Sequence, residues 1–343
     1  MHQFSSKYAL DETLVTADTH LVTSRAVSPI PTPLPPVSAQ NLIAGRFRVT
    51  VDNDRLRLVA VIAAAVGFGL GPYLASRTLD SGISPLGASS IRLAVMAVVM
   101  SPAAYQLKGW GRESVLVAGA GAASGAGITG FYAALNQAPI AAVTVVYYTY
   151  PVVVVVLAAL IGKRRLLKWE VASGVGVLAG VVLAVGPVSL SIGLLLSLAP
   201  AFAAPLGWSV LLLVLCGPAA SMPTRPKVFA AACGGAAVLL PLAMWQTDAK
   251  LMPATSDAVI SIGLLSVVGL AIPSLLMTWG ASRTSEQTTA IVGSFEFVVA
   301  VAAGWLLLGG GLKPTQIIGV LLVLGAVTWS AAPQSRNLPV SNN

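Results

Sequence analysis

The sequence predicts an all-α polytopic membrane protein, with ten transmembrane helices in two inverted five-helix repeats. Its composition is the first observation, because 56% of the 343 residues are hydrophobic and only 9% are charged. Soluble domains carry about 25% charged residues. Long apolar runs, such as residues 115–135 and 259–281, reach the roughly 20 residues that a membrane-spanning helix needs. The placement of basic residues and an internal repeat are the other two observations.

Residues 1–54 are expected to form a disordered cytoplasmic tail. The segment is rich in Ser, Thr and Pro, and residues 29–36 read Pro-Ile-Pro-Thr-Pro-Leu-Pro-Pro. This composition cannot bury a core and favours extended polyproline geometry. No charged stretch followed by a short apolar run is present, so a secretory signal is not expected. A docking segment for a partner is the alternative interpretation of the tail.

Ten apolar segments follow from Leu56 onward, separated by polar and proline-containing breaks. Each is expected to be a transmembrane helix. They cover roughly residues 56–76, 85–107, 114–135, 140–161, 169–186, 190–216, 227–246, 258–281, 288–308 and 314–332. We therefore expect a first five-helix repeat over residues 55–187, a second over 188–332, and a short C-terminal tail over 333–343.

The basic residues near the segment ends predict the orientation, because cytoplasmic loops carry an excess of Lys and Arg. With the N-terminus inside, the outer loops hold only Arg77, Lys250 and Lys313. The inner side holds fourteen basic residues, namely Arg46, Arg48, Arg55, Arg57, Lys108, Arg112, Lys163, Arg164, Arg165, Lys168, Arg225, Lys227, Arg283 and Arg336. Both termini are therefore expected in the cytoplasm of a multi-pass plasma-membrane protein.

The fourth and fifth segments resemble the ninth and tenth. Residues 147–155, Tyr-Tyr-Thr-Tyr-Pro-Val-Val-Val-Val, can be laid on residues 293–301, Gly-Ser-Phe-Glu-Phe-Val-Val-Ala-Val, with a shift of 297 − 151 = 146. Gly174 and Gly180 fall on Gly319 and Gly325 with a shift of 145. Because the repeat unit has an odd number of helices, the second copy must be inverted in the bilayer. Many secondary transporters are built this way, with the binding site between the repeats.

These features resemble a tandem pair of EamA repeats of the drug/metabolite transporter superfamily, over about residues 56–332. The residues that carry the resemblance are Phe68-Gly69, Ile83–Leu86, Arg92-Leu93-Ala94, Tyr132–Leu135, Ala138–Val143, Tyr150-Pro151, Ser294–Phe297, Leu306–Gly309 and Gly319. The sequence departs from the family at three places. A Glu usually follows the glycine that closes the fourth and ninth helices, but Lys163 and Gly310 occupy these positions, and Phe297 replaces a family proline.

The resemblance implies a cavity between the halves and secondary transport of small organic metabolites or drug-like solutes by alternating access. Export across the cytoplasmic membrane is the expected direction, although the residues themselves leave the direction open. The expected partners are the solute and the lipid bilayer, with no nucleic acid, and a homodimer stays open.

Only two charges lie deep in apolar segments. Glu296 is about eight residues into the ninth segment, roughly 12 Å from its cytoplasmic end, and Arg92 is roughly 10 Å from the outer end of the second. A charge at the bilayer centre costs about 2.5–3.5 kcal/mol on insertion scales, so both should face the protein interior or water. We expect Glu296 to bind a substrate amine or a proton, and Arg92 to contact an anionic group. The alternative is a structural ion pair between helices.

Four aromatic residues complete the predicted binding site. Tyr147 and Tyr150 share a helix face near the middle of their segment, and Tyr73 and Trp208 add aromatic surface on other helices. Aromatic residues with a polar tip commonly line ligand cavities. They also form the belt at the membrane–water interface, which is the alternative interpretation.

Several chemistries are not expected. The only histidines, His2 and His20, lie in the tail, and Cys216 and Cys233 lie in apolar runs, so neither a metal site nor a cofactor is predicted. No phosphate-binding Gly-x-x-x-x-Gly-Lys-Ser/Thr loop occurs. The membrane segments hold no catalytic set of paired Asp, His or Ser and Lys, so an embedded enzyme is not favoured. A structural or sensor protein that transports nothing stays open as an alternative.

Overall fold

The computed structural model of the chain describes residues 39–161, 167–186, 191–245, 255–308, 311 and 313–331. Every regular element in this part is a helix. Nine helical stretches are long and apolar enough to cross a membrane, and a shorter apolar helix, Pro314–Ser330, occupies the tenth position. Each coincides with one of the ten predicted segments, which confirms the fold class. We refer to them as the first to tenth spans.

Five spans make up the first half of the bundle. The first is part of α1 (Ala39–Asp80), and the second is α2 (Pro85–Met100), continued by a 3₁₀ stretch, η1 (Ser101–Gly109). The remaining elements are α3 (Gly111–Leu135), α4 (Ile140–Tyr147), α5 (Tyr150–Leu160) and α6 (Lys168–Val185). Together, α4 and α5 form the fourth span.

The second half repeats this order. The sixth span consists of α7 (Ile192–Leu198), η2 (Ala199–Phe202) and α8 (Ala203–Cys216), and the seventh is α9 (Thr224–Trp245). The eighth consists of α10 (Ser256–Ser266), a π-helical turn, η3 (Val267–Ala271), and α11 (Ile272–Ala281). The ninth consists of α12 (Glu286–Gly293) and α13 (Phe295–Leu308), and the tenth is α14 (Pro314–Ala331).

The helix starts follow local sequence signals. Ser84, Ser191, Thr255 and Ser285 each precede a helix, and each side chain accepts a hydrogen bond from a backbone N–H of the first turn. This satisfies a donor that would otherwise have no partner at the helix N-terminus. The polar breaks between apolar segments therefore stop one helix and start the next.

The start of α1 differs from the sequence-based expectation. Residues 39–54, assigned above to a disordered tail, are helical, since α1 begins at Ala39. No proline occurs between Pro36 and Pro72, so nothing in this stretch stops the first span from extending backwards. The chain divides into two compact units, Met1–Arg46 and Phe47–Asn343, and the second holds all ten spans. The rest of the predicted tail (1–38), the C-terminal tail and the loop positions 162–166, 187–190, 246–254, 309–310 and 312 lie outside the described residues.

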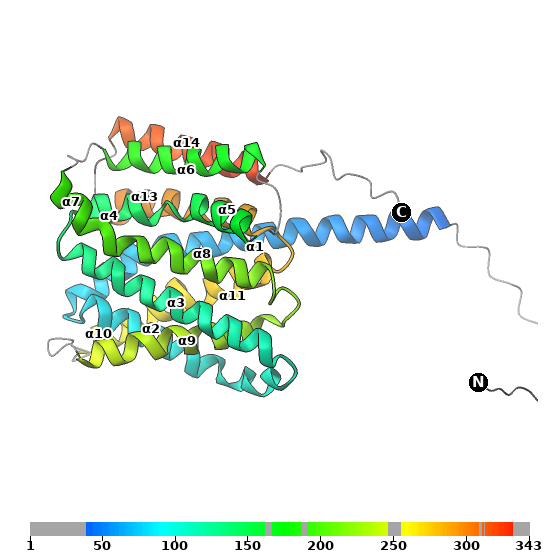
Figure 1. Cartoon of the computed structure of the whole chain (residues 1–343), viewed down its shortest axis with the longest axis horizontal. Coiled ribbons are helices and arrows are strands. Elements are labelled where there is room, and N and C mark those ends of the chain that lie inside the picture. Colours follow the sequence, from blue (N-terminus) through cyan, green and yellow to red (C-terminus); the bar gives the residue numbers. More distant parts are fainter. Residues whose placement is uncertain are drawn as a thin grey trace, which may run out of the picture. The chain divides into compact units, whose positions relative to one another are not determined.

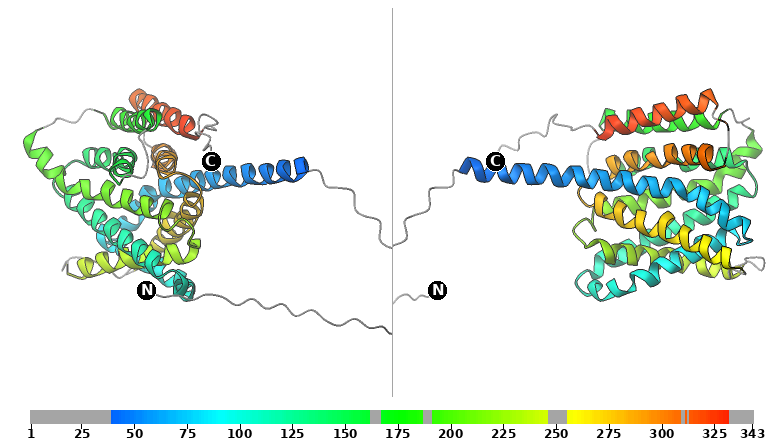
Figure 2. Two further views of the ribbon diagram at one scale, coloured as in Figure 1. Left: turned by 45° about the vertical axis from the view of Figure 1, so that its right-hand side comes forward. Right: turned by 180° about the vertical axis from the view of Figure 1, so that it is seen from behind.

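Within the second unit, the spans run side by side, and α6 and α14 lie together at one edge (Figure 1; two further views in Figure 2). Two glycines bring these helices into backbone contact. A β-carbon added at Gly180 would lie 2.6 Å from the carbonyl oxygen of Gly319, and one added at Gly319 would collide with the carbonyl of Gly180. Small residues allow such close packing of helices in a bilayer. The fifth and tenth spans, which are equivalent in the repeat, therefore pair with each other.

The third span packs along α8 and α9 in the same manner. A β-carbon at Gly125 would lie 2.9 Å from the carbonyl oxygen of Gly235, and one at Gly127 would lie 2.6 Å from that of Ala203. The glycines of α3 thus join the first half of the chain to the second over much of the helix length.

An aromatic pair also relates the two halves. Gly67-Phe68 in the first span and Gly207-Trp208 in the sixth have the same order. Gly67 packs against Pro273 of the eighth span, and Gly207 packs against Ala123 of the third, its counterpart in the repeat. The Phe68 and Trp208 rings meet edge to face, with centroids 6.0 Å apart. The first and sixth spans, which open the two repeats, are therefore in direct contact.

Candidate functional site

The fourth and ninth spans are both interrupted near their middle. In the fourth, α4 ends at Tyr147 and α5 begins at Tyr150; in the ninth, α12 ends at Gly293 and α13 begins at Phe295. The shift of 146 that relates the repeats carries 147 to 293, so the two breaks lie at equivalent positions. Interrupted helices at the repeat interface form the binding sites of many secondary transporters.

The break in the fourth span follows from Pro151. Proline has no N–H, so the carbonyl of Tyr147 loses its α-helical partner. The hydroxyl of Thr149 donates to the carbonyl of Val146 at 2.7 Å, and the backbone N–H of Thr149 donates to the same carbonyl. These tighter three-residue contacts close the end of α4.

The break in the ninth span forms without a proline, since Phe297 occupies that position. Here the hydroxyl of Ser294 donates to the carbonyl of Ala290 at 3.0 Å. Such back-bonding of a serine to the preceding turn bends helices. The departure from the family pattern therefore leaves the interruption in place.

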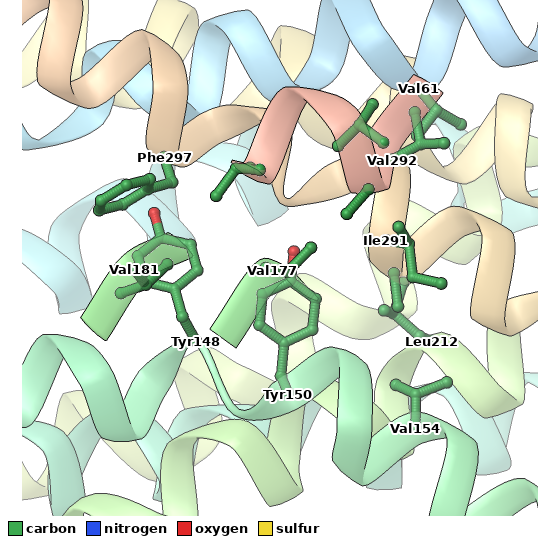
Figure 3. Close-up of a cluster of buried hydrophobic side chains, with 14 of the residues drawn as sticks. Val61, Tyr148, Tyr150, Val154, Val177, Val181, Leu212, Ile291, Val292 and Phe297 are labelled. Atoms are coloured by element: carbon green, nitrogen blue, oxygen red, sulfur yellow. The ribbon is translucent and has the colours of Figure 1, made fainter. Parts of the chain in front are cut away.

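Three tyrosines gather at the fourth-span break, and Figure 3 shows Tyr148 and Tyr150 reaching towards the ninth span. The ring centroids of Tyr147 and Tyr148 are 5.2 Å apart, and those of Tyr147 and Tyr150 are 5.7 Å apart. Tyr148 meets Phe297 edge to face at 5.2 Å, and Phe131 of α3 meets Tyr147 at 6.1 Å. We call Phe131, Tyr147, Tyr148, Tyr150 and Phe297 the aromatic cluster.

The carboxyl group of Glu296 lies against this cluster. The side chain is buried, with 8% of its surface exposed. The carboxyl lies close enough to act electrostatically on Tyr147, Tyr148 and Tyr150. One of its oxygens, Oε1, is buried and has no hydrogen-bonding partner among the described residues. One carboxyl oxygen is therefore available to a proton or a ligand.

Arg92 of α2 lies near Tyr147 but is not paired with Glu296. Its guanidinium acts electrostatically on Tyr147 and is not among the groups that act on the Glu296 carboxyl. Its buried Nε has no hydrogen-bonding partner in the described part of the chain. The structural ion pair considered from the sequence is thus not formed in this structure, and Tyr147 lies within reach of both charges.

A hydrogen bond between two buried hydroxyls joins the breaks. Ser294 Oγ lies 3.1 Å from Tyr150 Oη, and the exposed fractions of the two side chains are 0% and 1%. The carbonyl of Tyr150 also accepts a bond from Ser209 of the sixth span at 3.3 Å. The fourth span is therefore held by polar contacts to two helices of the other repeat.

The remaining two predicted site residues have different surroundings. Trp208 packs against the hydrophobic core that contains Tyr148, Tyr150 and Phe297. The side chain of Tyr73 forms no hydrogen bond or ring contact with any described residue, and only its carbonyl is engaged, by Ser76. The structure thus brings Glu296, Tyr147 and Tyr150 together, with Arg92 close enough to act on Tyr147, while Trp208 packs against the same hydrophobic core and Tyr73 makes no ring contact with the cluster.

Sequence reasoning missed Tyr148, Ser294 and Phe131. A continuous helix would turn Tyr148 away from the face shared by Tyr147 and Tyr150, and the break turns it inwards. The alignment of Tyr148 with Ser294 in the repeat was a usable signal, because equivalent positions of inverted repeats meet near the site. Within the described residues, no group of three or more His, Cys, Asp or Glu side chains is placed to hold a metal ion.

Comparison with known proteins agrees with this architecture. No curated protein sequence matches the chain. Among solved structures, 29 chains match; one crystal structure aligns over 80% of this chain and 96% of its own, with a TM-score of 0.66 and 20% identity. This likeness shows a shared fold. The model of the EamA-like transporter family matches twice, over residues 56–186 and 191–331. The chain is therefore a multi-pass membrane protein that belongs to the EamA-like transporter family of the drug/metabolite transporter superfamily, with two tandem repeats.

Proposed function

We propose that this protein is a secondary transporter that exports small organic solutes across the plasma membrane by alternating access. In this proposal both termini are cytoplasmic, and the solute binds where the interrupted fourth and ninth spans face each other. Membership of a transporter family supports the general activity. The contacts around Glu296 support the location of the site.

The observation that carries the proposal is the incomplete pairing of Glu296. A carboxyl group within a membrane span is costly unless it is paired or hydrogen-bonded. Oε1 is buried and has no hydrogen-bonding partner among the described residues. A protonated amine or a proton that binds Oε1 would give this oxygen the partner that it lacks. Arg92, whose guanidinium also acts electrostatically on Tyr147, would contact an anionic group of the solute.

The packing around the site fits alternating access. The interrupted spans come from opposite repeats, and a hydrogen bond between Tyr150 and Ser294 links their breaks. Close backbone contacts join the halves at Gly180 with Gly319 and along α3, and a β-carbon added at Gly69 of the first span would lie 2.5 Å from the carbonyl oxygen of Glu296 at the ninth-span break. In this proposal the halves rock about the contacts of α3, α6 and α14 while the contacts at the breaks change.

The test is Glu296→Gln, which keeps the side-chain shape and removes the charge. The solute is first identified by an untargeted metabolite comparison of cells with and without the protein, and its transport is then measured in proteoliposomes. We expect Glu296→Gln to abolish transport with near-normal expression. Glu286→Gln, at the end of the same span, is the matched control and is expected to transport normally.

Three results would contradict the proposal. Unchanged transport by Glu296→Gln would remove the carboxyl from the mechanism. Loss of folded protein that is rescued by adding Arg92→Gln would instead establish a structural ion pair, whose disruption costs roughly 3–5 kcal/mol. Absence of transport of every candidate solute in proteoliposomes would favour a structural or sensor role.

A further inference from the structure

We propose that a sodium ion binds where α6, α12 and α14 converge, among buried polar side chains that lie outside the solute site. The side chains belong to Glu170 and Ser173 of α6, Gln287 of α12 and Ser330 of α14, and each is at most 3% exposed. We call these four residues the polar group. The ion site is independent of the solute, so it can be tested before the solute is identified.

The polar group lies one helical turn beyond a hydrophobic core that the three helices share. Val177 of α6, Ile291 of α12 and Val327 of α14 belong to this core. On each helix a member of the polar group is three or four positions from the core residue, so both lie on the same helix face. Because successive spans alternate in direction, α6 and α12 begin at the end of the bundle where α14 terminates. The polar residues of the three helices therefore gather at this end.

The contacts between α6 and α14 place the two serines of the polar group opposite each other. A β-carbon added at Gly180 would lie 3.1 Å from the backbone nitrogen of Val323, and one at Gly176 would lie 3.4 Å from the β-carbon of Ala326. Residue numbers thus fall along one helix as they rise along the other, so the pair is antiparallel. The next turn in this register brings the two serines together (Figure 1 shows the two helices side by side).

The hydroxyls of these two serines lack the partner that other buried serines of the spans have. Ser90, Ser209 and Ser266 each donate to the carbonyl four residues earlier, at 2.6–2.7 Å. The oxygens of Ser173 and Ser330 are buried and have no hydrogen-bonding partner among the described residues. A buried polar atom without a partner is costly. Both oxygens are therefore open to a ligand held between the helices.

The polar group supplies oxygen atoms, which suit a hard cation. Glu170 contributes a carboxyl, Gln287 an amide oxygen, and the serines two hydroxyls. The last backbone carbonyls of α14 have no helical donor, and they carry the negative end of the helix dipole. Helix C-terminal ends coordinate sodium in several secondary transporters. The side chains and the end of α14 thus provide the ligands that a sodium ion needs.

Size and charge favour sodium over other inorganic cations. The packing at Gly176 and Gly180 leaves little room between α6 and α14, which disfavours the larger potassium ion. The polar group holds a single carboxyl, and no set of three or more His, Cys, Asp or Glu in the described ranges is placed to hold a metal ion. Calcium and magnesium need about six or more oxygen ligands, usually with several carboxylates or waters. One carboxyl balances the charge of one sodium ion.

The internal repeat indicates that the fold does not require this polar group. The shifts of 145 and 146 relate its four positions to Thr315, Ile318, Ala141 and Val185. Three of these are apolar, so the other end of the bundle lacks the same set of side chains. The polar group is therefore a property of one end of this chain and not of the repeated architecture.

Sodium binding is tested first by the melting temperature of the purified full-length protein in detergent. NaCl is varied, and KCl or N-methyl-D-glucamine chloride keeps the ionic strength constant. We expect a saturable rise of Tm with sodium and little change with the other two salts, because a ligand that binds only the folded state stabilises it. Equilibrium binding of radioactive sodium, displaced by unlabelled NaCl, measures the same site directly.

Variants locate the ion. Glu170→Gln and Ser173→Ala are each expected to raise the sodium concentration at half of the Tm rise about tenfold, since each weakens a contact with a charged ion. Ser266→Ala is the matched control, because this buried serine is bonded within its own helix. Its response to sodium should be unchanged. Glu296→Gln should also keep the response, since the solute site is separate.

Several results would overturn the inference. Equal Tm rises with potassium or N-methyl-D-glucamine would show an effect of ionic strength or an unselective site. A Tm that does not depend on sodium, with no binding of radioactive sodium, would leave the hydroxyls to water. If Ser173→Ala keeps the full sodium response, or Glu296→Gln loses it, the ion binds elsewhere. Should Glu170→Gln fail to fold, sodium binding to the unaltered protein and to Ser173→Ala still decides the question.

Discussion

The hydrogen bond between Tyr150 and Ser294 should couple the two repeats energetically, and a double-mutant cycle can measure this coupling. The perturbations are Tyr150→Phe, which removes only the hydroxyl, and Ser294→Ala. Both side chains are buried, and their oxygens are 3.1 Å apart. Hydrogen bonds between helices in a bilayer contribute about 0.6 kcal/mol on average and up to about 1.7 kcal/mol. We therefore expect a coupling free energy of about 0.6 kcal/mol.

The structure also predicts which single change costs more. In Tyr150→Phe, Ser294 still donates to the carbonyl of Ala290, so no hydroxyl is left without a partner. In Ser294→Ala, the buried hydroxyl of Tyr150 loses its partner, and an unsatisfied buried polar group costs about 1–3 kcal/mol. Ser294→Ala should therefore lower the free energy of unfolding more than Tyr150→Phe.

The assay is reversible unfolding of the full-length protein in mixed micelles, for both single variants and the double variant. Tyr148→Phe combined with Ser294→Ala is the control cycle, because the Tyr148 hydroxyl lies in the same aromatic cluster and does not bond to Ser294. Its effects should add. Additive effects in the Tyr150–Ser294 cycle, or a larger cost for Tyr150→Phe, would refute the reasoning.

Three further outcomes are expected. Gly180→Ala places a β-carbon 2.6 Å from the Gly319 carbonyl oxygen, and this overpacking should cost about 1–3 kcal/mol, measured as a lower Tm in detergent. The control Gly176→Ala makes only ordinary contact at 3.4 Å and should keep its Tm. Equal Tm values for the two variants would contradict this prediction. Deletion of residues 1–38, which have no periodic apolar face, should leave insertion and transport intact, and loss of stable protein would show that the segment belongs to the fold. A reporter that works only outside the cytoplasm should be silent when fused after Arg336, and activity there would disprove the proposed topology.

The spans could be predicted from the sequence because the bilayer imposes its requirements on each segment separately. Each spanning segment must satisfy its own backbone hydrogen bonds and present apolar side chains to lipid. An apolar run such as residues 258–281 therefore predicts a transmembrane helix whatever its neighbours are, and the structure has a span at Ser256–Ala281. The prediction of disorder was wrong for residues 39–54, which belong to α1. A helical stretch outside the apolar segments need not present apolar side chains to lipid, so it lacks the pattern that predicts a span.

The repeat and part of the site could also be predicted from the sequence, because they depend on residue types that are rare in apolar segments. A lone carboxyl in an apolar run must turn inwards, and Glu296 is buried accordingly. The alignment of Tyr150-Pro151 with Glu296-Phe297 indicated equivalent positions, and both spans are interrupted there.

Only the tertiary structure decided which of these residues meet. It bonded Tyr150 to Ser294, 144 positions away, left Arg92 unpaired with Glu296, turned Tyr148 into the aromatic cluster and kept Tyr73 out of it. Such contacts depend on how each helix is rotated about its axis and how closely it approaches its neighbours. Backbone contacts between small residues that are distant in the sequence set this rotation and distance. The hydropathy of a single segment does not predict which of these residues meet.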